Sequence, residues 1–298
     1  MSSRKLLYLF LLVLCSCRND VKEEEKGTPV SGSFTLFTDK AFLPVANVLA
    51  TSFCSVYPEI VITIDTGNGS EGLKRLADHR CNAVLSARAV SATDSAALAS
   101  RSKFFRQFHI GSDAVALICN RADSLKFSGP QTPQQLLANC LKDTTITICT
   151  SSPASDDNLI IGELVPEAKA CMAEWHSFSN TPDVISNVQE NRGAVGIVSW
   201  SYLSETQNRA IMKIKEGIYV LPLINSGNDT LSRFPDQNSI VENKYPLPRK
   251  IYLTTSEPYA GPAHGFASYV ASDEGQRILR LFGLAPYKMP AREVEITR

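Results

Sequence analysis

The sequence predicts an α/β protein of two lobes, in which each lobe is a mostly parallel sheet flanked by helices. The chain has 298 residues, and because one domain usually takes about 100 to 200 residues, this length suits two lobes that each bury a core. Short apolar runs alternate along the chain with segments of helical periodicity, which is typical of parallel sheets. Hydrophobic residues make up 44% of the chain, a share that excludes a disordered or fibrous protein.

The charges of the chain balance. Lysine and arginine together number 30, and aspartate and glutamate together also number 30. A protein that holds a nucleic-acid backbone needs a surplus of positive charge, because the phosphates are bound by basic side chains. We therefore expect no nucleic-acid partner.

The N-terminus indicates export. Arg4 and Lys5 precede the apolar run 6–14. This run is too short to cross a bilayer core, which takes about 20 helical residues, so it predicts a signal peptide rather than a membrane anchor.

The segment Leu14-Cys15-Ser16-Cys17 resembles the lipobox of bacterial lipoproteins. The resemblance implies that residues 1–17 are a lipoprotein signal peptide and that lipidated Cys17 is the mature N-terminus. The exported protein is then anchored to a bilayer of the bacterial envelope, facing the periplasm or lying at the cell surface. A cleaved secretory signal that leaves Cys17 free is the alternative. Residues 18–32 are polar, with too little apolar surface to offset the entropy of ordering, and predict a flexible linker.

Strands and helices alternate after the linker. Residues 32–37, 59–64 and 83–86 are apolar runs that each predict a strand. Between the first two, apolar residues recur at three- and four-residue steps over 42–56, which predicts a helix that ends before Pro58. The resulting strand-helix order is that of a parallel sheet.

The middle of the chain repeats this alternation. Residues 113–119, 144–149 and 194–199 are apolar and predict strands. Thr132, followed by Pro133, matches the start of a capped helix, and a further helix begins at Thr181. These elements are sufficient for a second sheet with its own helices.

The last part of the chain adds further strands and helices. Residues 219–224 and 250–254 predict two more strands. Two helices follow, at 262–271 and 273–282. The second helix begins after Ser272, a good N-cap residue, and ends before a glycine.

A glycine-rich loop at 66–72 joins a strand to the helix that contains residues 73–77. Glycines let consecutive backbone N–H groups point into one concavity, and a helix N-terminus adds unpaired donors, so Gly69 and Ser70 are candidates to bind an oxyanion. No Gly-Lys-Ser/Thr follows, which excludes a Walker A loop. A turn that serves topology alone is the alternative.

Arg88 follows the strand 83–86 directly. In open α/β sheets ligands collect at the carboxyl ends of the strands, where a guanidinium can meet an anion with several donors. A solvated surface arginine is the alternative.

A serine-rich loop follows the strand 144–149. Ser151, Ser152 and Ser155 supply hydroxyl groups that can donate to an oxyanion next to another helix N-terminus. A plain capping loop is the alternative, because Asp156 and Asp157 favour the helix dipole without any ligand.

The cysteines do not suggest a metal site. Six follow the leader, at Cys54, Cys81, Cys119, Cys140, Cys149 and Cys171. Several lie in apolar runs, where a thiol behaves as a small hydrophobe. Free thiols in the core are therefore favoured, and a single disulfide bond between two of them is the alternative. We expect no bound metal and no cofactor.

Together with the segments 193–199, 245–253 and 272–278, these motifs resemble the phosphate-binding lipoproteins of ABC importers, within the type II periplasmic binding protein superfamily. The resemblance covers about residues 33–288. It implies a first lobe of residues 33–111 and 248–298 and a second lobe of residues 112–247, closing around a ligand by hinge motion.

The resemblance also implies a site and partners. Its anion-binding loops correspond to Thr38, Asp39, Gly69, Ser70, Arg88 and the serines Ser151, Ser152 and Ser155. Thr38 and Asp39 enter through the resemblance alone. The implied function is that of a monomeric solute-binding lipoprotein that captures a small oxyanion, phosphate favoured, and delivers it to an ABC permease.

One departure from the family pattern leaves other functions open. Phosphate-binding members usually carry a second arginine in the second-lobe loop, whereas residues 150–158 contain no basic residue. Since a charge-assisted hydrogen bond contributes about 1.5 to 3 kcal/mol, its loss weakens anion binding by roughly one to two decades. An acceptor such as Asp39 or Asp156 would still suit a protonated oxyanion.

The alternatives are therefore two. The first is a surface or periplasmic binding or interaction lipoprotein with a different ligand. The second, less favoured, is a serine-dependent hydrolase built on the serine loop, for which no recognisable catalytic histidine motif is present.

Overall fold

The computed structural model describes residues 27–101, 104–205, 208–225 and 231–288. The expected signal peptide, with Cys17, and residues 18–26 of the expected linker lie outside the described residues. None of the helices in the described ranges is both long and apolar enough to cross a bilayer.

The strands of the described residues form one continuous sheet in the order β2-β1-β3-β9-β4-β7-β5-β6, with β8 and β10 also paired to β4. Pairing is parallel in β2-β1-β3 and in β7-β5-β6, and antiparallel wherever β4 or β9 takes part. The strands are β1 (Gly32–Asp39), β2 (Ile60–Gly67), β3 (Ala83–Ser86), β4 (Arg106–Asn120), β5 (Thr147–Thr150), β6 (His176–Ser177), β7 (Ala194–Ser199), β8 (Ile218–Val220), β9 (Pro248–Thr255) and β10 (Ala285–Pro286).

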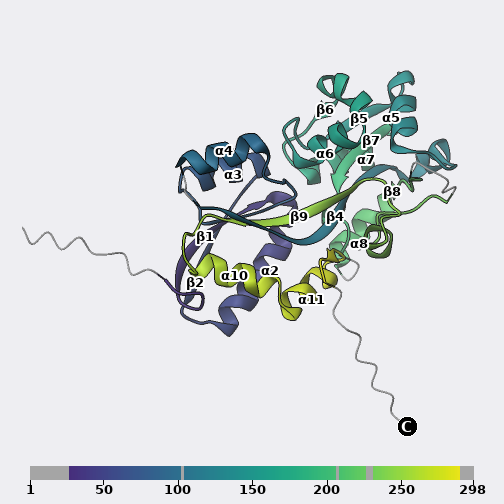
Figure 1. The fold of residues 1–298 in the computed structure, drawn as a ribbon. Coiled ribbons are helices and arrows are strands. Elements are labelled where there is room, and N and C mark those ends of the chain that lie inside the picture. The colour runs from purple at the N-terminus through teal and green to yellow at the C-terminus, as the bar shows by residue number, and fades with distance from the viewer. Residues whose placement is uncertain (1–26, 102–103, 206–207, 226–230, 289–298) are drawn as a thin grey trace, which may run out of the picture.

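The helices divide between two lobes, which Figure 1 shows on either side of β4 and β9. Those of the first lobe are α2 (Leu43–Val56), α3 (Gly69–Ala77), α4 (Ala92–Arg101), α10 (Pro262–Val270) and α11 (Asp273–Leu281), with the 3₁₀ helix η1 (Lys40–Phe42). Those of the second are α5 (Pro133–Lys142), α6 (Asp156–Leu164), α7 (Thr181–Glu190), α8 (Arg209–Gly217) and α9 (Gln237–Val241), with the 3₁₀ helices η2 (Arg121–Phe127), η3 (Pro166–Ala170), η4 (Met172–Glu174) and η5 (Trp200–Tyr202).

The predicted fold class is confirmed: each lobe has a short parallel sheet flanked by helices. The helix predicted at 42–56 is α2, and its apolar stripe is buried. Phe53 on that stripe packs edge-on against Phe266 of α10 at 5.5 Å between ring centroids. The first core therefore joins a helix near the start of the chain to one near its end.

The second core lies around β7, which is buried at every position. Gly196 in this strand leaves room for its neighbours, since an added Cβ would lie 2.9 Å from Cγ1 of Ile118 and 3.1 Å from Cγ1 of Val184. Strand β4 thus packs closely against β7 and α7.

Two long strands connect the lobes. β4 and β9 pair antiparallel from Arg106 opposite Thr255 to Ala114 opposite Pro248, with a bulge that leaves Ile110 unpaired in the ladder. The carbonyl of Ile110 accepts from Nε2 of Gln276 at 3.1 Å. Because both strands run from one lobe into the other (Figure 1), they position the surfaces that face each other between the lobes.

Several boundaries differ from the sequence predictions. The strand predicted at 219–224 is only Ile218–Val220, because Pro222 has no backbone N–H with which to continue the ladder. The strand predicted at 113–119 extends over Arg106–Asn120. In the described part of the chain all six cysteines are free thiols, and four of them are buried.

Candidate functional site

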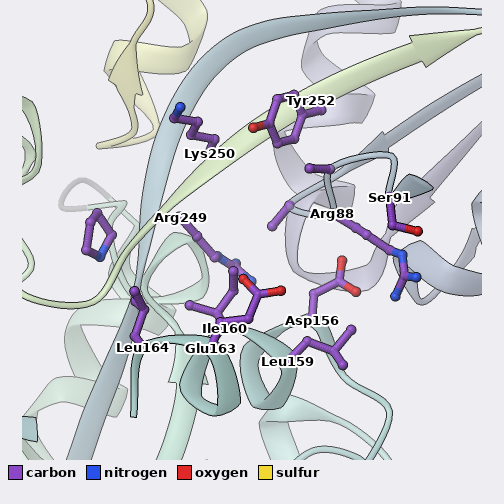
Figure 2. A pocket seen from close by; sticks show the side chains of 13 residues that line it. Arg88, Ser91, Asp156, Leu159, Ile160, Glu163, Leu164, Arg249, Lys250 and Tyr252 are labelled. Atoms are coloured by element: carbon purple, nitrogen blue, oxygen red, sulfur yellow. The ribbon is translucent and has the colours of Figure 1, made fainter. Parts of the chain in front are cut away.

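Within the described residues, a smaller and a larger cavity lie where the lobes meet. The smaller has a volume of about 270 Å³ and is lined by the ends of β1 and β2 and by the loops that precede α6 and α7. The larger has a volume of about 550 Å³ and lies between the loop after β3, helix α6 and strand β9 (Figure 2). Asp156 lines both cavities.

Among the described helices, α3, α6 and α7 all begin at the smaller cavity. Their N-cap residues Asn68, Ser155 and Asn180 line it. Each cap accepts a hydrogen bond from one first-turn N–H, while helix geometry leaves the other N–H groups of that turn without a partner in the helix. Three positive helix ends around one cavity favour an anion without needing a cationic side chain.

The serine loop is fixed over the first turn of α6. Ser151, Ser152 and Ser155 all line the smaller cavity. Asn158 holds the loop in place, since its Nδ2 donates to the carbonyl of Ser152 at 2.8 Å and its Oδ1 accepts from Oγ1 of Thr150 at 2.8 Å. The hydroxyl groups are therefore presented by a rigid loop.

A buried ion cluster lies beneath the cavities. Nη2 of Arg249 is 2.6 Å from Oδ2 of Asp113, and Nη1 is 2.8 Å from Oδ1 of Asp157. Oγ of Ser199 donates to both oxygens of Asp157 at 3.0 Å. The guanidinium also lies over the ring of Phe42, 5.0 Å from its centroid. Arg249 thus connects β4, β9, α6 and η1.

Asp39 and Asp156 form a second acidic group, which lies across the two lobes. Oδ1 of Asp39 accepts from the N–H of Ala41 at 2.9 Å. Asp156 is 3% exposed, and neither of its carboxylate oxygens has a donor among the described residues. Burial and the adjacent Asp39 carboxylate raise the pKa of Asp156 to about 8. Burial also raises the pKa of Asp39, although Arg249 opposes it. The two carboxyls therefore share a proton at neutral pH.

The lobes approach most closely at Gly69. A Cβ on this residue would lie 2.4 Å from Oδ2 of Asp156 and 3.1 Å from Cβ of Arg88. No side chain fits there while the lobes stay in this arrangement. The glycine of the predicted anion loop is thus required for contact between the lobes.

Arg88 lies beside the larger cavity and outside the lining of the smaller one. Its Nη1 donates to Oγ of Ser70 at 2.7 Å, and its Nη2 is 3.2 Å from Oδ2 of Asp94. Its Nε is buried with no acceptor in the described part of the chain. The guanidinium therefore supports the first turn of α3 from the side.

The other predicted site residues lie near the same place. Thr38 is buried, and its hydroxyl donates to the carbonyl of Asp39 at 3.2 Å. Gly69 and Ser70 form the first turn of α3. Of the predicted site residues, Asp39, Ser151, Ser152 and Ser155 line the smaller cavity. The structure brings the predicted loops of both lobes together, and their role in binding stays a prediction.

Sequence reasoning missed Asn68, Lys40 and Arg249 as residues of this region. Asn68 and Lys40 line the smaller cavity, and an N-cap asparagine before Gly69 was a visible signal. Arg249 within an apolar strand signals a buried ion pair, but its partners Asp113 and Asp157 lie 136 and 92 positions away in the sequence. Only the folded chain reveals that pairing.

A family model described as a PBP superfamily domain matches residues 23–274. The chain belongs to this superfamily. This family assignment agrees with the expected binding role rather than with the alternative of a hydrolase. No curated protein sequence matches the chain.

Solved structures share the fold at low sequence identity. A putative phosphate ABC transporter substrate-binding protein from Clostridium perfringens, solved with bound phosphate, is 18% identical, with 86% of this chain and 100% of that chain covered and a TM-score of 0.68. An ABC-type phosphate transport receptor from Vibrio cholerae is 14% identical, with 86% and 100% covered and a TM-score of 0.63.

A third structure, the CcmR regulatory domain of Synechocystis PCC6803 in complex with 2-PG, is 10% identical, with 81% of this chain and 96% of that chain covered and a TM-score of 0.56. The fold therefore occurs in transport-related and in regulatory proteins. The ligand of the present protein has to be argued from its own cleft.

Proposed function

We propose that the protein is a solute-binding lipoprotein that captures a small oxyanion, phosphate favoured, in the smaller cavity and delivers it to an ABC importer. Its lobes are the predicted segments 33–111 with 248–298, and 112–247. Cys17 is lipidated and anchors the monomeric protein to a bilayer of the bacterial envelope. The observation that carries the proposal is the convergence of three helix N-termini on one cavity, together with the serine hydroxyls.

The positive charge for the anion comes mainly from the backbone. Arg249 is already paired with two carboxylates, and Arg88 is paired with Asp94 outside the smaller cavity. Lys40 lines this cavity and is exposed. Helix N-termini bind anions without a full positive charge, so the absence of a second-lobe arginine is compatible with an oxyanion site.

Phosphate is favoured over sulfate because of the acidic groups in the cavity wall. Asp39, Asp156 and Asp157 all line the smaller cavity. Monohydrogen phosphate has a proton that it can donate to a carboxylate, whereas sulfate has none and meets only repulsion. The acids therefore select against a fully deprotonated anion.

Calorimetric titration of the purified protein with phosphate, sulfate and molybdate at pH 7 tests the proposal. Binding heat from phosphate and none from sulfate is the expected result. Heat from sulfate alone would reverse the choice of ligand. No heat from any of the three would favour the second candidate.

That second candidate is a binding protein of the same fold for a different, less anionic ligand. It is favoured by the surplus of carboxylates over bases where the lobes meet, since Asp39 and Asp156 have no guanidinium within hydrogen-bond distance in the described ranges.

A further inference from the structure

Asp156 has an unusual position for a carboxylate. It is 3% exposed, and both oxygens have no hydrogen-bond donor among the described residues. An ionised carboxylate in such a place is costly unless a cation or several donors reach it. Asp156 shares a proton with Asp39 when it is protonated, but the described part of the chain provides no donor for its ionised form.

The nearby guanidinium groups are committed elsewhere. Arg249 binds Asp113 and Asp157. The two terminal nitrogens of Arg88 bind Ser70 and Asp94, and its buried Nε makes no hydrogen bond to Asp156. Figure 2 shows the amino group of Lys250 pointing away from Asp156. The missing partner of Asp156 is thus expected to come from outside the protein.

The larger cavity offers room for such a partner. Its volume is about 550 Å³. This is far more than a five-atom oxyanion needs. Its walls combine the apolar side chains of Leu159 and Ile160 with a second carboxylate, Glu163, on the same face of α6 (Figure 2). The cavity suits a short alkyl group that ends in a cation.

Asp156 lines both this cavity and the smaller one. A cationic group only a few bonds from an oxyanion can therefore reach it while the oxyanion stays at the helix N-termini. A metal ion fits less well, because no cluster of three or more potential ligands is present in the described ranges.

We propose, on the basis of the oxyanion function above, that the ligand is an aminoalkyl phosphate or phosphonate whose ammonium group binds Asp156 from the larger cavity. The oxyanion occupies the smaller cavity. Inorganic phosphate then fills only part of the site.

The protonation of the empty cleft supports this assignment. Asp39 faces Asp156 from the other lobe, and the raised pKa of Asp156, about 8, results from burial and from that neighbour. Arg249 and Asp157 also act on its charge, and Arg88, Glu163 and Lys250 are the other charged groups that line the larger cavity. The ammonium takes the place of the shared proton, so binding of the ligand releases a proton near neutral pH.

The test compares three probes by calorimetry: 2-aminoethyl phosphate, ethyl phosphate and inorganic phosphate. A desolvated charge-assisted bond predicts that 2-aminoethyl phosphate binds about tenfold or more tightly than ethyl phosphate, which has the same phosphate and ethyl group but lacks the terminal ammonium. Equal affinities overturn the inference but leave the oxyanion function intact. If none of the three binds, the oxyanion function itself is contradicted.

A pair of matched variants locates the effect. Asp156 and Asp273 are each the first residue of a nine-residue helix with a serine N-cap, but Asp273 is exposed on α11. Asp156→Asn is expected to reduce the preference for 2-aminoethyl phosphate to less than about twofold, since the charged acceptor is gone. Asp273→Asn is expected to keep it. A preference that survives Asp156→Asn overturns the inference.

Proton release gives a readout that needs no variant. Titrations of the unmodified protein at pH 7 in two buffers of different ionisation enthalpy are expected to show more proton release with 2-aminoethyl phosphate than with ethyl phosphate. Equal proton release with the two esters would contradict the role of Asp156.

Discussion

Two acidic side chains lie side by side where the lobes meet, and they differ in their hydrogen-bond and ion-pair partners. Asp157 is paired with Arg249 and also accepts from Ser199. Asp156, the preceding residue on the same first turn of α6, is just as buried but has no donor among the described residues. Since both carry the same functional group at nearly the same depth, the difference lies in their partners alone.

The comparison distinguishes a charged cluster that stabilises the fold from an acidic pair that is available to a ligand. The Asp113–Arg249–Asp157 cluster is satisfied within the protein and stabilises the junction of the lobes. The Asp39–Asp156 pair is left with a shared proton, which an incoming ligand can replace. A buried polar group without a partner is rare in folded proteins and marks a place where function adds what the fold lacks.

Removing the cation of the satisfied cluster is expected to have the largest effect. Arg249→Met leaves Asp113 and Asp157 buried without their cation, which predicts a loss of about 3 to 5 kcal/mol in the free energy of unfolding. Urea denaturation at pH 7 measures it. The control is Lys244→Met, because Lys244 and its partner Glu242 are 46% and 53% exposed, and it is expected to cost about 1 kcal/mol or less. Equal losses in the two variants would remove the distinction between buried and surface pairs.

The Asp39–Asp156 pair predicts that the free energy of unfolding depends on pH. Asp156 titrates near its ordinary value of 3.8 when unfolded and near 8 when folded, so the folded state binds the extra proton between these values. The free energy of unfolding therefore falls as the pH rises from about 4 to about 8. Relative to Asp156→Asn, the unmodified protein is expected to lose about 2 to 4 kcal/mol between pH 5 and pH 8.

Urea denaturation at several pH values measures this difference. Asp273→Asn provides the control, since its carboxylate is exposed on α11, and its curve should run parallel to that of the unmodified protein. Parallel curves for Asp156→Asn as well would show that Asp156 is ionised in the folded protein.

The contact between the lobes gives the smallest of these effects. Gly69→Ala places a Cβ 2.4 Å from Oδ2 of Asp156, and relief of such a clash typically costs about 1 to 3 kcal/mol. Because the clash arises only when the lobes are together, it should appear as weaker phosphate binding, by about tenfold, rather than as a lower melting temperature. Gly162→Ala is the control, since its added Cβ meets no atom closer than 3.5 Å. Unchanged affinity in Gly69→Ala would show that the lobes close differently.

Local patterns predicted most of the fold. Strands 83–86 and 194–199 have the expected bounds, and Thr132 forms the expected capping box with Gln135. These features depend on near neighbours in the chain. Helix α4 was missed because its apolar stripe is thin, with Leu98 as its buried residue. The full length of β4 was missed because its first half alternates polar and apolar side chains on a partly exposed sheet face.

The site was less accessible from the sequence than the fold. The loops that begin at Gly69 and Ser151 could be found because glycine and serine next to a helix start have local meaning. The hydrogen-bond partners of Arg88 could not be predicted, since its bond to Ser70 depends on how two loops 18 positions apart fold together. The protonation of Asp156 depends on Asp39, which belongs to the other lobe.

The bulge in β4 lies where the strand is held by the C-terminal part of the first lobe. The carbonyl of Ile110 is held by Gln276 and also accepts from the N–H of Tyr287 at 3.2 Å, so the strand is fixed to the first lobe up to that residue. Beyond it, β4 stays paired with β9 as far as Ala114, and Asp113 in this stretch binds Arg249. We expect the Asp113–Arg249 pair, which joins the two connecting strands, to stay intact during the hinge motion that the family resemblance implies.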